Sequence, residues 1–188
     1  MDHAVEVQNI LVERCRKGDR QACRQLYEQY ARAMYNICLR MVNEAAEAED
    51  ILQESFLQVF SHLSGFRGES SIGAWIKRIV VNNCLNHLKK RKVRFQPLDE
   101  VTESSQDGSP VDERAFSLTV ARVLDAIRQL PDGYRIVLNL FLLEDYTHRE
   151  IGQMLGLSES AVKTQYHRAK QKVRKILEEK NLDLSGVI

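Results

Sequence analysis

The sequence has 188 residues, 44% of them hydrophobic, so it is long and apolar enough to fold around a core as one domain or two small ones. Its formal net charge is only +1, which excludes attraction to nucleic acid through an overall excess of positive charge. No stretch approaches the ~20 apolar residues of a membrane-spanning helix, so we expect a soluble protein.

The first half of the sequence predicts helices, because glycine and proline are sparse and apolar residues recur at intervals of three and four. The first helix should end near Gly18, with Asp19 capping the second. A third helix is expected over 47–63 and a fourth over 71–92. The apolar face of the first helix is expected to be Val7, Ile10, Leu11 and Cys15. Together the four helices predict one compact bundle.

The third helix is acidic, since five acids and no lysine or arginine lie between Arg40 and Arg67. Four side chains at i, i+3, i+4 and i+7 form one outward stripe, opposite the apolar face. They are Asp50, Gln53, Glu54 and Leu57. The stripe suits a basic helical partner; the alternative is a solvated helix face.

The fourth helix is basic. Residues 75–95 carry seven lysines and arginines, no acid, one tryptophan and three asparagines. Cations neutralise phosphates, asparagines pair with base edges and an aromatic ring can stack on an unpaired base. The segment therefore predicts a nucleic-acid surface. The alternatives are that residues 89–94 are a solvated helix end and that Trp75 packs in the core.

Residues 93–114 interrupt the periodicity with Pro97, Pro110 and six acids, and we interpret them as a flexible acidic linker. Apolar periodicity resumes at Leu118. A second, smaller helical domain is therefore predicted from about residue 115.

A helix-turn-helix is predicted between His148 and His167. Gly152 is small where two helices approach, Gly156 can adopt the left-handed turn and Ser158 can cap the second helix. That helix would present polar and basic side chains to DNA, namely Glu159, Ser160, Lys163, Thr164, His167, Arg168 and Lys170.

The four cysteines include no CxxC pair, and we see no signal peptide ahead of them. We therefore expect reduced thiols in a cytosol. No phosphate-binding glycine loop, metal-ligand spacing or nucleophile motif appears, and the histidines are scattered. We predict no enzyme, no cofactor and no metal site.

Three segments in order make nearly the whole chain resemble the extracytoplasmic-function sigma factors, small bacterial transcription-initiation subunits. Residues 48–56, AEDILQESF, resemble the family's core-polymerase-binding helix. Residues 66–71, FRGESS, followed by WIKRI at 75–79 and by Asn82, resemble its promoter-melting segment. EIG at 150–152, LGLS at 155–158, VK at 162–163 and HRA at 167–169 resemble its upstream-element reader.

The resemblance implies an all-α protein in two domains. Residues 1–92 would form a helical bundle, sigma region 2, that binds core RNA polymerase and recognises and melts the downstream (−10) promoter element. Residues 115–188 would form sigma region 4, whose helix-turn-helix reads the upstream (−35) element, and residues 93–114 would link the two. The linker would thread through the polymerase and mimic a polyanion, or be a plain tether. The implied partners are the β and β′ subunits, promoter DNA and a regulator such as an anti-sigma factor, in the bacterial cytoplasm.

The family also implies roles for residues. Asp50, Gln53, Glu54 and Leu57 would contact the polymerase. The downstream element would contact Phe66, Arg67, Gly68, Glu69, Ser70, Trp75, Lys77, Arg78, Asn82, Asn83, Asn86, Lys89 and Lys90. The upstream element would contact Ser158, Glu159, Ser160, Lys163, Thr164, His167, Arg168 and Lys170.

Four positions depart from the family pattern. Asn86 stands where the family usually has an acid and Val81 where it usually has a basic residue, and these two affect base preference. In the second domain, Ala161 stands where the family typically has a threonine and Gln165 where it typically has an arginine. We interpret Gln165 as a missing phosphate anchor, which predicts weaker upstream recognition.

A rival reading is a stand-alone helix-turn-helix regulator, since residues 150–168 also resemble the output domain of response regulators. Such a protein needs a receiver or ligand-binding domain upstream. Residues 1–92 show no alternating strands and helices, which favours the sigma factor.

Overall fold

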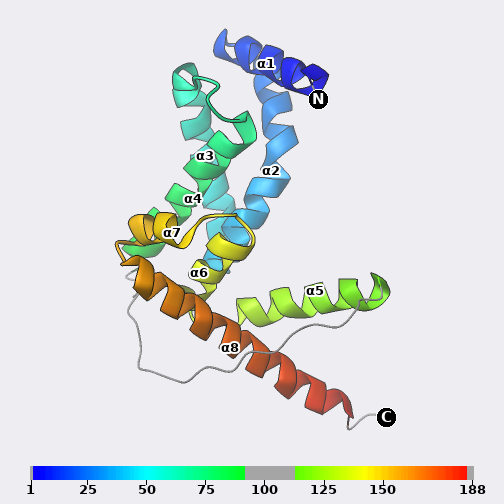
Figure 1. Cartoon of the computed structure of the whole chain (residues 1–188). Coiled ribbons are helices and arrows are strands. Elements are labelled where there is room, and N and C mark those ends of the chain that lie inside the picture. The colour runs from blue at the N-terminus through cyan, green and yellow to red at the C-terminus, as the bar shows by residue number, and fades with distance from the viewer. Residues whose placement is uncertain (1, 92–112, 186–188) are drawn as a thin grey trace. The chain divides into compact units, whose positions relative to one another are not determined.

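The computed structural model describes the backbone of residues 2–91 and 113–185 and the side chains of residues 9–91 and 120–180. Within these ranges the regular structure is helical and no strand occurs, so the predicted all-α class is confirmed. The chain divides into two units, Met1–Lys92 and Val93–Ile188 (Figure 1). The predicted acidic linker lies almost entirely outside the described residues.

The first unit contains α1 (Asp2–Arg16), α2 (Arg20–Val42), α3 (Ala45–His62), the short 3-10 helix η1 (Leu63–Gly65) and α4 (Ile72–Lys90). Helices α2, α3 and α4 pack against one another, while α1 contacts α2 and η1. Figure 1 shows α1 lying across the end of this three-helix bundle. The loop between η1 and α4 therefore lies beside α1.

Side-chain caps define where these helices begin. The Asp19 carboxylate accepts hydrogen bonds from the backbone N–H groups of Gln21 at 2.9 Å and Ala22 at 3.1 Å, as predicted for the start of α2. The bond from Ala22, followed by the guanidinium of Arg14, lowers the pKa of Asp19. Ser71 caps α4 by accepting from the backbone N–H of Ala74 at 3.2 Å.

The core of the first unit is built from apolar side chains of α2, α3, η1 and α4. Its fully buried side chains include Leu26, Met41, Val59, Leu63, Ile76, Val80 and Leu88. The expected apolar face of α1 is partly wrong, because Ile10 is 55% exposed whereas Val12 is 3% exposed. Helix α1 packs mainly on α2, and among its described side chains the buried ones are Val12 and Cys15.

The structure corrects the expectation of reduced thiols. Cys15 of α1 and Cys23 of α2 form a disulfide, whereas Cys38 and Cys84 are free and buried. The reason is geometric: the turn between α1 and α2 reverses the chain, so two residues eight positions apart stand with their Cα atoms 4.9 Å from each other. Sequence spacing without a CxxC pair gave no sign of this contact.

The second unit contains α5 (Glu113–Arg128), α6 (Asp132–Leu142), α7 (His148–Leu155) and α8 (Glu159–Ser185). Helix α5 begins slightly before the predicted start of the domain at residue 115. The long helix α8 contacts each of the other three, so it is the common support of the unit. One part of the core joins α5, α6 and α8 through Ala126, Ile127, Leu130, Leu138, Ala169 and Val173.

In the described part of the chain, no helix combines the length and the apolar character needed to cross a bilayer. Over the same residues, no group of three or more histidine, cysteine, aspartate or glutamate side chains is arranged to hold a metal ion.

Thiol labelling tests the disulfide. Labelling of the denatured protein without reductant should modify the two free cysteines, Cys38 and Cys84, and labelling after reduction should modify all four. The Cys23→Ser variant should show three thiols under both conditions, because Cys15 then has no partner. Four reactive thiols in the unreduced wild type, counted by intact mass, would contradict the disulfide.

Candidate functional site

The acidic stripe of α3 lies on the surface as predicted. The side chains of Asp50, Gln53, Glu54 and Leu57 are exposed, and Leu57 is 72% exposed. Their helix buries the opposite face, including Leu52, Phe56 and Val59. The stripe thus combines carboxylates with an exposed leucine, an arrangement suited to a partner that is basic around an apolar contact point.

The basic face of α4 also lies on the surface. Arg78, Asn82, Asn86, Lys89 and Lys90 are exposed, and Lys77 is half-buried. The other side of the helix is packed, with Ile76, Val80, Cys84 and Leu88 fully buried. One helix therefore supplies both a core face and a polar, cationic face that can reach phosphates and base edges.

Asn83 does not belong to this exposed face. It is buried, and its amide nitrogen donates to Ser55 Oγ at 3.0 Å and to Gln58 Oε1 at 3.2 Å, both on α3. One step along a helix turns a side chain by about 100°, which carries Asn83 away from Asn82 and towards α3. The structure gives Asn83 a packing role in place of the expected contact with DNA.

The loop before α4 has a buried stem and an exposed tip. Phe66 is 8% exposed and packs on the half-buried Trp75, with ring centroids 5.5 Å apart. The expected DNA contacts Arg67, Gly68, Glu69 and Ser70 are all exposed. Gly68 has a φ of +74°, a conformation that favours glycine. The aromatic pair thus fixes the stem and leaves the polar tip available.

Sequence reasoning missed one residue at this loop, Arg16 at the end of α1. Its Nε donates to the carbonyl oxygen of Leu63 at 3.0 Å, and its Nη2 donates to that of Phe66. A single arginine at the end of a helix carries no sequence signal of such a contact. The contact of Arg16 with the loop follows from the position of α1 beside η1 in the folded structure.

The helix-turn-helix forms as predicted from α7 and α8. A capping box starts α7, in which the Thr147 N–H donates to Glu150 Oε2 at 2.8 Å and the Glu150 N–H donates to Thr147 Oγ1 at 3.3 Å. Gly156 ends α7 with a φ of +70°. Ser158 then accepts from the backbone N–H of Ala161 at 3.1 Å, at the start of α8.

Gly152 allows the close approach inside the turn. A Cβ atom at this position would lie 2.7 Å from the backbone carbonyl oxygen of Leu157. The Leu157 N–H donates to the Gly152 carbonyl at 2.9 Å, so the two backbone segments are directly bonded. A close approach at this glycine is therefore confirmed, although the tight contact is with the backbone of the turn that leads into α8.

The start of α8 presents the expected reader side chains. Ser158, Glu159, Ser160, Lys163, Thr164 and Lys170 are exposed, and His167 and Arg168 are half-buried. Lys163 Nζ lies 2.7 Å from Glu159 Oε1, and this hydrogen bond lowers the pKa of Glu159. The N-terminal turns of α8 thus display both charges and hydroxyl groups.

Gln165 faces inward, which corrects the interpretation of this position. It is 2% exposed, on the side of α8 that packs against the rest of the unit. A buried side chain is not placed to contact a phosphate, so Gln165 is not an exposed site from which a phosphate anchor is missing.

His148 is part of an aromatic cluster that joins α6, α7 and α8. Its ring stacks on Phe141 at 4.2 Å and meets Tyr166 edge-on at 5.3 Å. Burial, followed by the positive charge of Lys163, lowers the pKa of His148. The ring therefore serves mainly to pack the two helices of the helix-turn-helix, α7 and α8, against α6 and each other.

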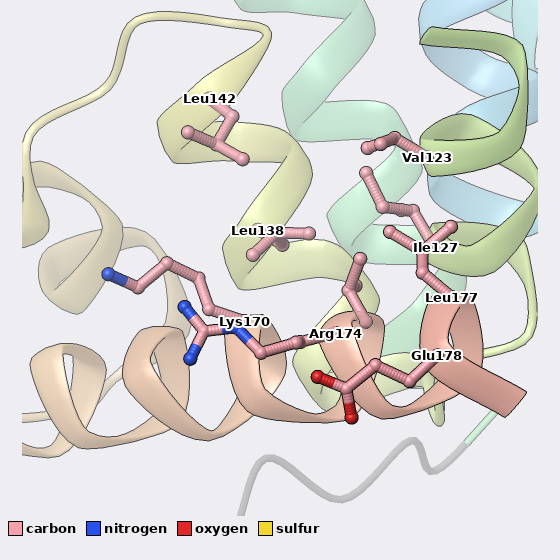
Figure 2. A pocket seen from close by; sticks show the side chains of 9 residues that line it. Val123, Ile127, Leu138, Leu142, Lys170, Arg174, Leu177 and Glu178 are labelled. Carbon is pink, nitrogen blue, oxygen red and sulfur yellow. The ribbon is translucent and has the colours of Figure 1, made fainter. Parts of the chain in front are cut away.

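An apolar groove of about 280 Å³ lies between α5, α6 and α8, and sequence reasoning did not identify it. Figure 2 shows its apolar side chains beside Lys170, Arg174 and Glu178 of α8. The apolar lining consists of Val123, Ile127, Leu138, Leu142, Val173 and Leu177.

Comparison with known proteins matches two family models to the chain, Sigma-70 region 2 over residues 26–94 and Sigma-70, region 4 over residues 121–173. The chain is 30% identical over 176 residues to the ECF RNA polymerase sigma factor SigW of Bacillus subtilis, covering 88% of this chain and 94% of SigW. It is 31% identical over 178 residues to the RNA polymerase sigma-H factor of Pseudomonas aeruginosa, covering 89% and 92%.

Among solved structures, the sigma factor RpoE in complex with the anti-sigma factor NepR from Bartonella quintana shares the fold. The TM-score is 0.54 at 19% identity, covering 82% of this chain and 96% of that chain. The acidic stripe, the loop and the basic face fall inside the region 2 match, and the helix-turn-helix falls inside the region 4 match. Helix α1 lies outside both.

Substitution of Gly152 tests the close approach in the helix-turn-helix. Gly152→Ala should destabilise the second unit by about 1–3 kcal/mol, because the new methyl group clashes with a backbone oxygen. The cost of this clash exceeds the gain from alanine's better helix propensity. Gln153→Ala, at the exposed neighbouring position of α7, is the control. Urea unfolding followed by circular dichroism measures both. Equal stability of the two variants would show that the contact is not tight.

Proposed function

The chain belongs to the extracytoplasmic-function RNA polymerase sigma factors, which direct the polymerase to promoters, and on that premise we propose how its surfaces divide this work. The first unit binds core polymerase and opens the downstream promoter element. The second unit reads the upstream element, and residues 93–114 connect the two. One observation carries the proposal. Helices α3 and α4 pack against each other, and each exposes a face of opposite charge, acidic on α3 and basic on α4.

In this proposal the acidic stripe of α3 docks on the polymerase. Asp50 and Glu54 meet basic side chains of a helical surface, which in the family belongs to the clamp helices of the largest subunit. Leu57 is the apolar contact at one end of the stripe, since a large leucine that is 72% exposed gains from being covered by a partner. Attraction between the charges speeds encounter and selects the orientation.

The basic face of α4 and the loop before it then capture the separated strand. Unstacking a base costs a few kcal/mol, which binding of the exposed strand must offset. Arg78 and Lys89 neutralise phosphates, while Asn82 and Asn86 contact base edges. The exposed tip at 67–70 receives the unstacked base above the packed pair Phe66 and Trp75.

The start of α8 lies in the major groove at the upstream element. Ser160, Lys163 and Thr164 are exposed on its first turns and contact base edges. Arg168 and Lys170, further along the helix, contact phosphates and fix its register. This division matches the usual geometry in which the N-terminal residues of the second helix read the sequence.

The proposal requires no covalent chemistry, so the protein acts without a catalytic group or cofactor. Its place of action is the bacterial cytoplasm, where the polymerase works. A regulator such as an anti-sigma factor would act by covering the same faces. The helical first unit supports this function over the stand-alone regulator, because the described residues contain no strand of a receiver domain.

Removing the acidic side chains should weaken polymerase binding. Asp50→Ala combined with Glu54→Ala is expected to raise the dissociation constant for core polymerase about tenfold, because two interface charge pairs are lost. Glu28→Ala, which removes an exposed carboxylate from α2, is the control. Titration of labelled core polymerase measures the affinity. An unchanged dissociation constant in the double variant would refute this docking surface.

Removing the polar side chains of α4 should affect DNA opening instead. Arg78→Ala combined with Asn82→Ala should leave polymerase affinity unchanged and abolish opening of duplex promoters. A pre-melted bubble template should restore part of the activity, because the strands are already separated. Arg32→Ala with Asn36→Ala is a matched control, since both side chains are exposed on α2 at the same spacing.

Permanganate footprinting and run-off transcription measure the opening. If the α4 variant opens duplex DNA as well as the α2 control does, the face does not take part in melting.

A further inference from the structure

Arg16 joins α1 to the chain that follows α3. Its Nε donates to the carbonyl oxygen of Leu63 at 3.0 Å, and its Nη2 donates to the carbonyl oxygen of Phe66. The donors of a guanidinium are fixed in one plane, so a side chain that bonds two carbonyls also fixes their relative positions. Arg16 therefore sets the geometry at the stem of the loop before α4.

The rest of this loop has few contacts of its own. Within the loop, the Phe66 N–H donates to the Leu63 carbonyl at 3.2 Å, and the Phe66 ring packs on Trp75. Beyond Phe66, residues 67–71 are exposed and form neither helix nor strand. The Arg67 and Glu69 side chains lie 3.9 Å apart and are highly exposed, so their attraction is strongly screened. The position of the tip thus depends on its stem.

Arg16 is itself held in place from α1. Its Nη1 pairs with Glu13 one turn earlier, and the neighbouring Cys15 is bonded to Cys23 of α2. Its side chain is only 25% exposed. An arginine fixed in this way loses little conformational entropy when it bonds the loop, which strengthens the contact.

The space between α1 and the loop is not filled by side chains. A cavity of about 240 Å³ lies there, lined by Asn9, Val12, Glu13, Arg16, Phe66, Arg67 and Gly68. Without the guanidinium the loop has room to shift towards α1. The two hydrogen bonds of Arg16 therefore act together with the packing of Phe66 on Trp75 to hold the loop at its distance from the helix.

We propose that Arg16 is a positioning residue for promoter opening: it holds the loop at 63–71 in the shape that receives the unstacked base. This inference rests on the function proposed above. It assigns a part in DNA opening to α1, which lies outside the region 2 match at 26–94. Arg16 acts through the loop and need not touch DNA.

The test uses the full chain with bacterial core polymerase and compares Arg16→Ala, Arg16→Lys and a control, Arg24→Ala. Arg24 is an exposed arginine of α2 whose side chain pairs with Glu28 on the same helix. Opening rates are measured on a duplex promoter and on bubble templates that differ only in the base offered to the loop.

Arg16→Ala should bind polymerase as the wild type does. It should open the duplex about ten- to hundredfold more slowly, the effect of losing charge-assisted hydrogen bonds that hold the loop. Its preference among the four bubble templates should become flatter. Arg16→Lys keeps one cationic donor and should restore part of both properties.

Two results would overturn the inference. One is an Arg16→Ala variant that opens DNA and selects bases as Arg24→Ala does. The other is a uniform loss on all templates with the base preference intact, since that indicates less folded protein and not a misplaced loop. If the wild-type chain itself fails to open the duplex, the proposed function fails, and the role of Arg16 fails with it.

Discussion

The packing of α4 on α3 is the constraint on which the functional surfaces of the first unit depend. The buried faces of the two helices include Phe56 and Val59 on α3 and Ile76 and Val80 on α4. Asn83 adds hydrogen bonds across this contact to Ser55 and Gln58. Because each helix has only one apolar face, burying it turns the acidic stripe of α3 and the basic face of α4 to the surface. A bonding asparagine at this contact also favours one register, because any other leaves its amide unsatisfied.

In the second unit, one long helix both packs in the core and carries the exposed side chains proposed to contact DNA. Helix α8 supplies core side chains to α5, α6 and α7 along one side, and its first turns carry the exposed reader residues. The close approach at Gly152 and the aromatic cluster of Phe141, His148 and Tyr166 fix α7 against it. The orientation of the reader thus follows from packing within the unit.

Much of this was predictable from local sequence patterns. Periodicity predicted the helices, and the caps Asp19 and Ser158 lie where their residue types indicated. The errors concern neighbours in space. From the sequence alone, Asn83 is expected to contact DNA and Gln165 is interpreted as a surface position where a phosphate anchor is missing, yet both side chains face inward. The disulfide between Cys15 and Cys23, the contacts of Arg16 and the groove between α5, α6 and α8 depend on how helices meet, which spacing along the chain does not encode.

The central claim is that two adjacent helices meet different partners, one protein and one nucleic acid. Photocrosslinking in the assembled complex of chain, core polymerase and promoter DNA tests it most directly. A photoreactive residue in place of Glu54 on α3 should crosslink to the largest polymerase subunit, and one in place of Asn86 on α4 should crosslink to promoter DNA. Crosslinking of both positions to the same partner, or of Glu54 to DNA, would contradict the account.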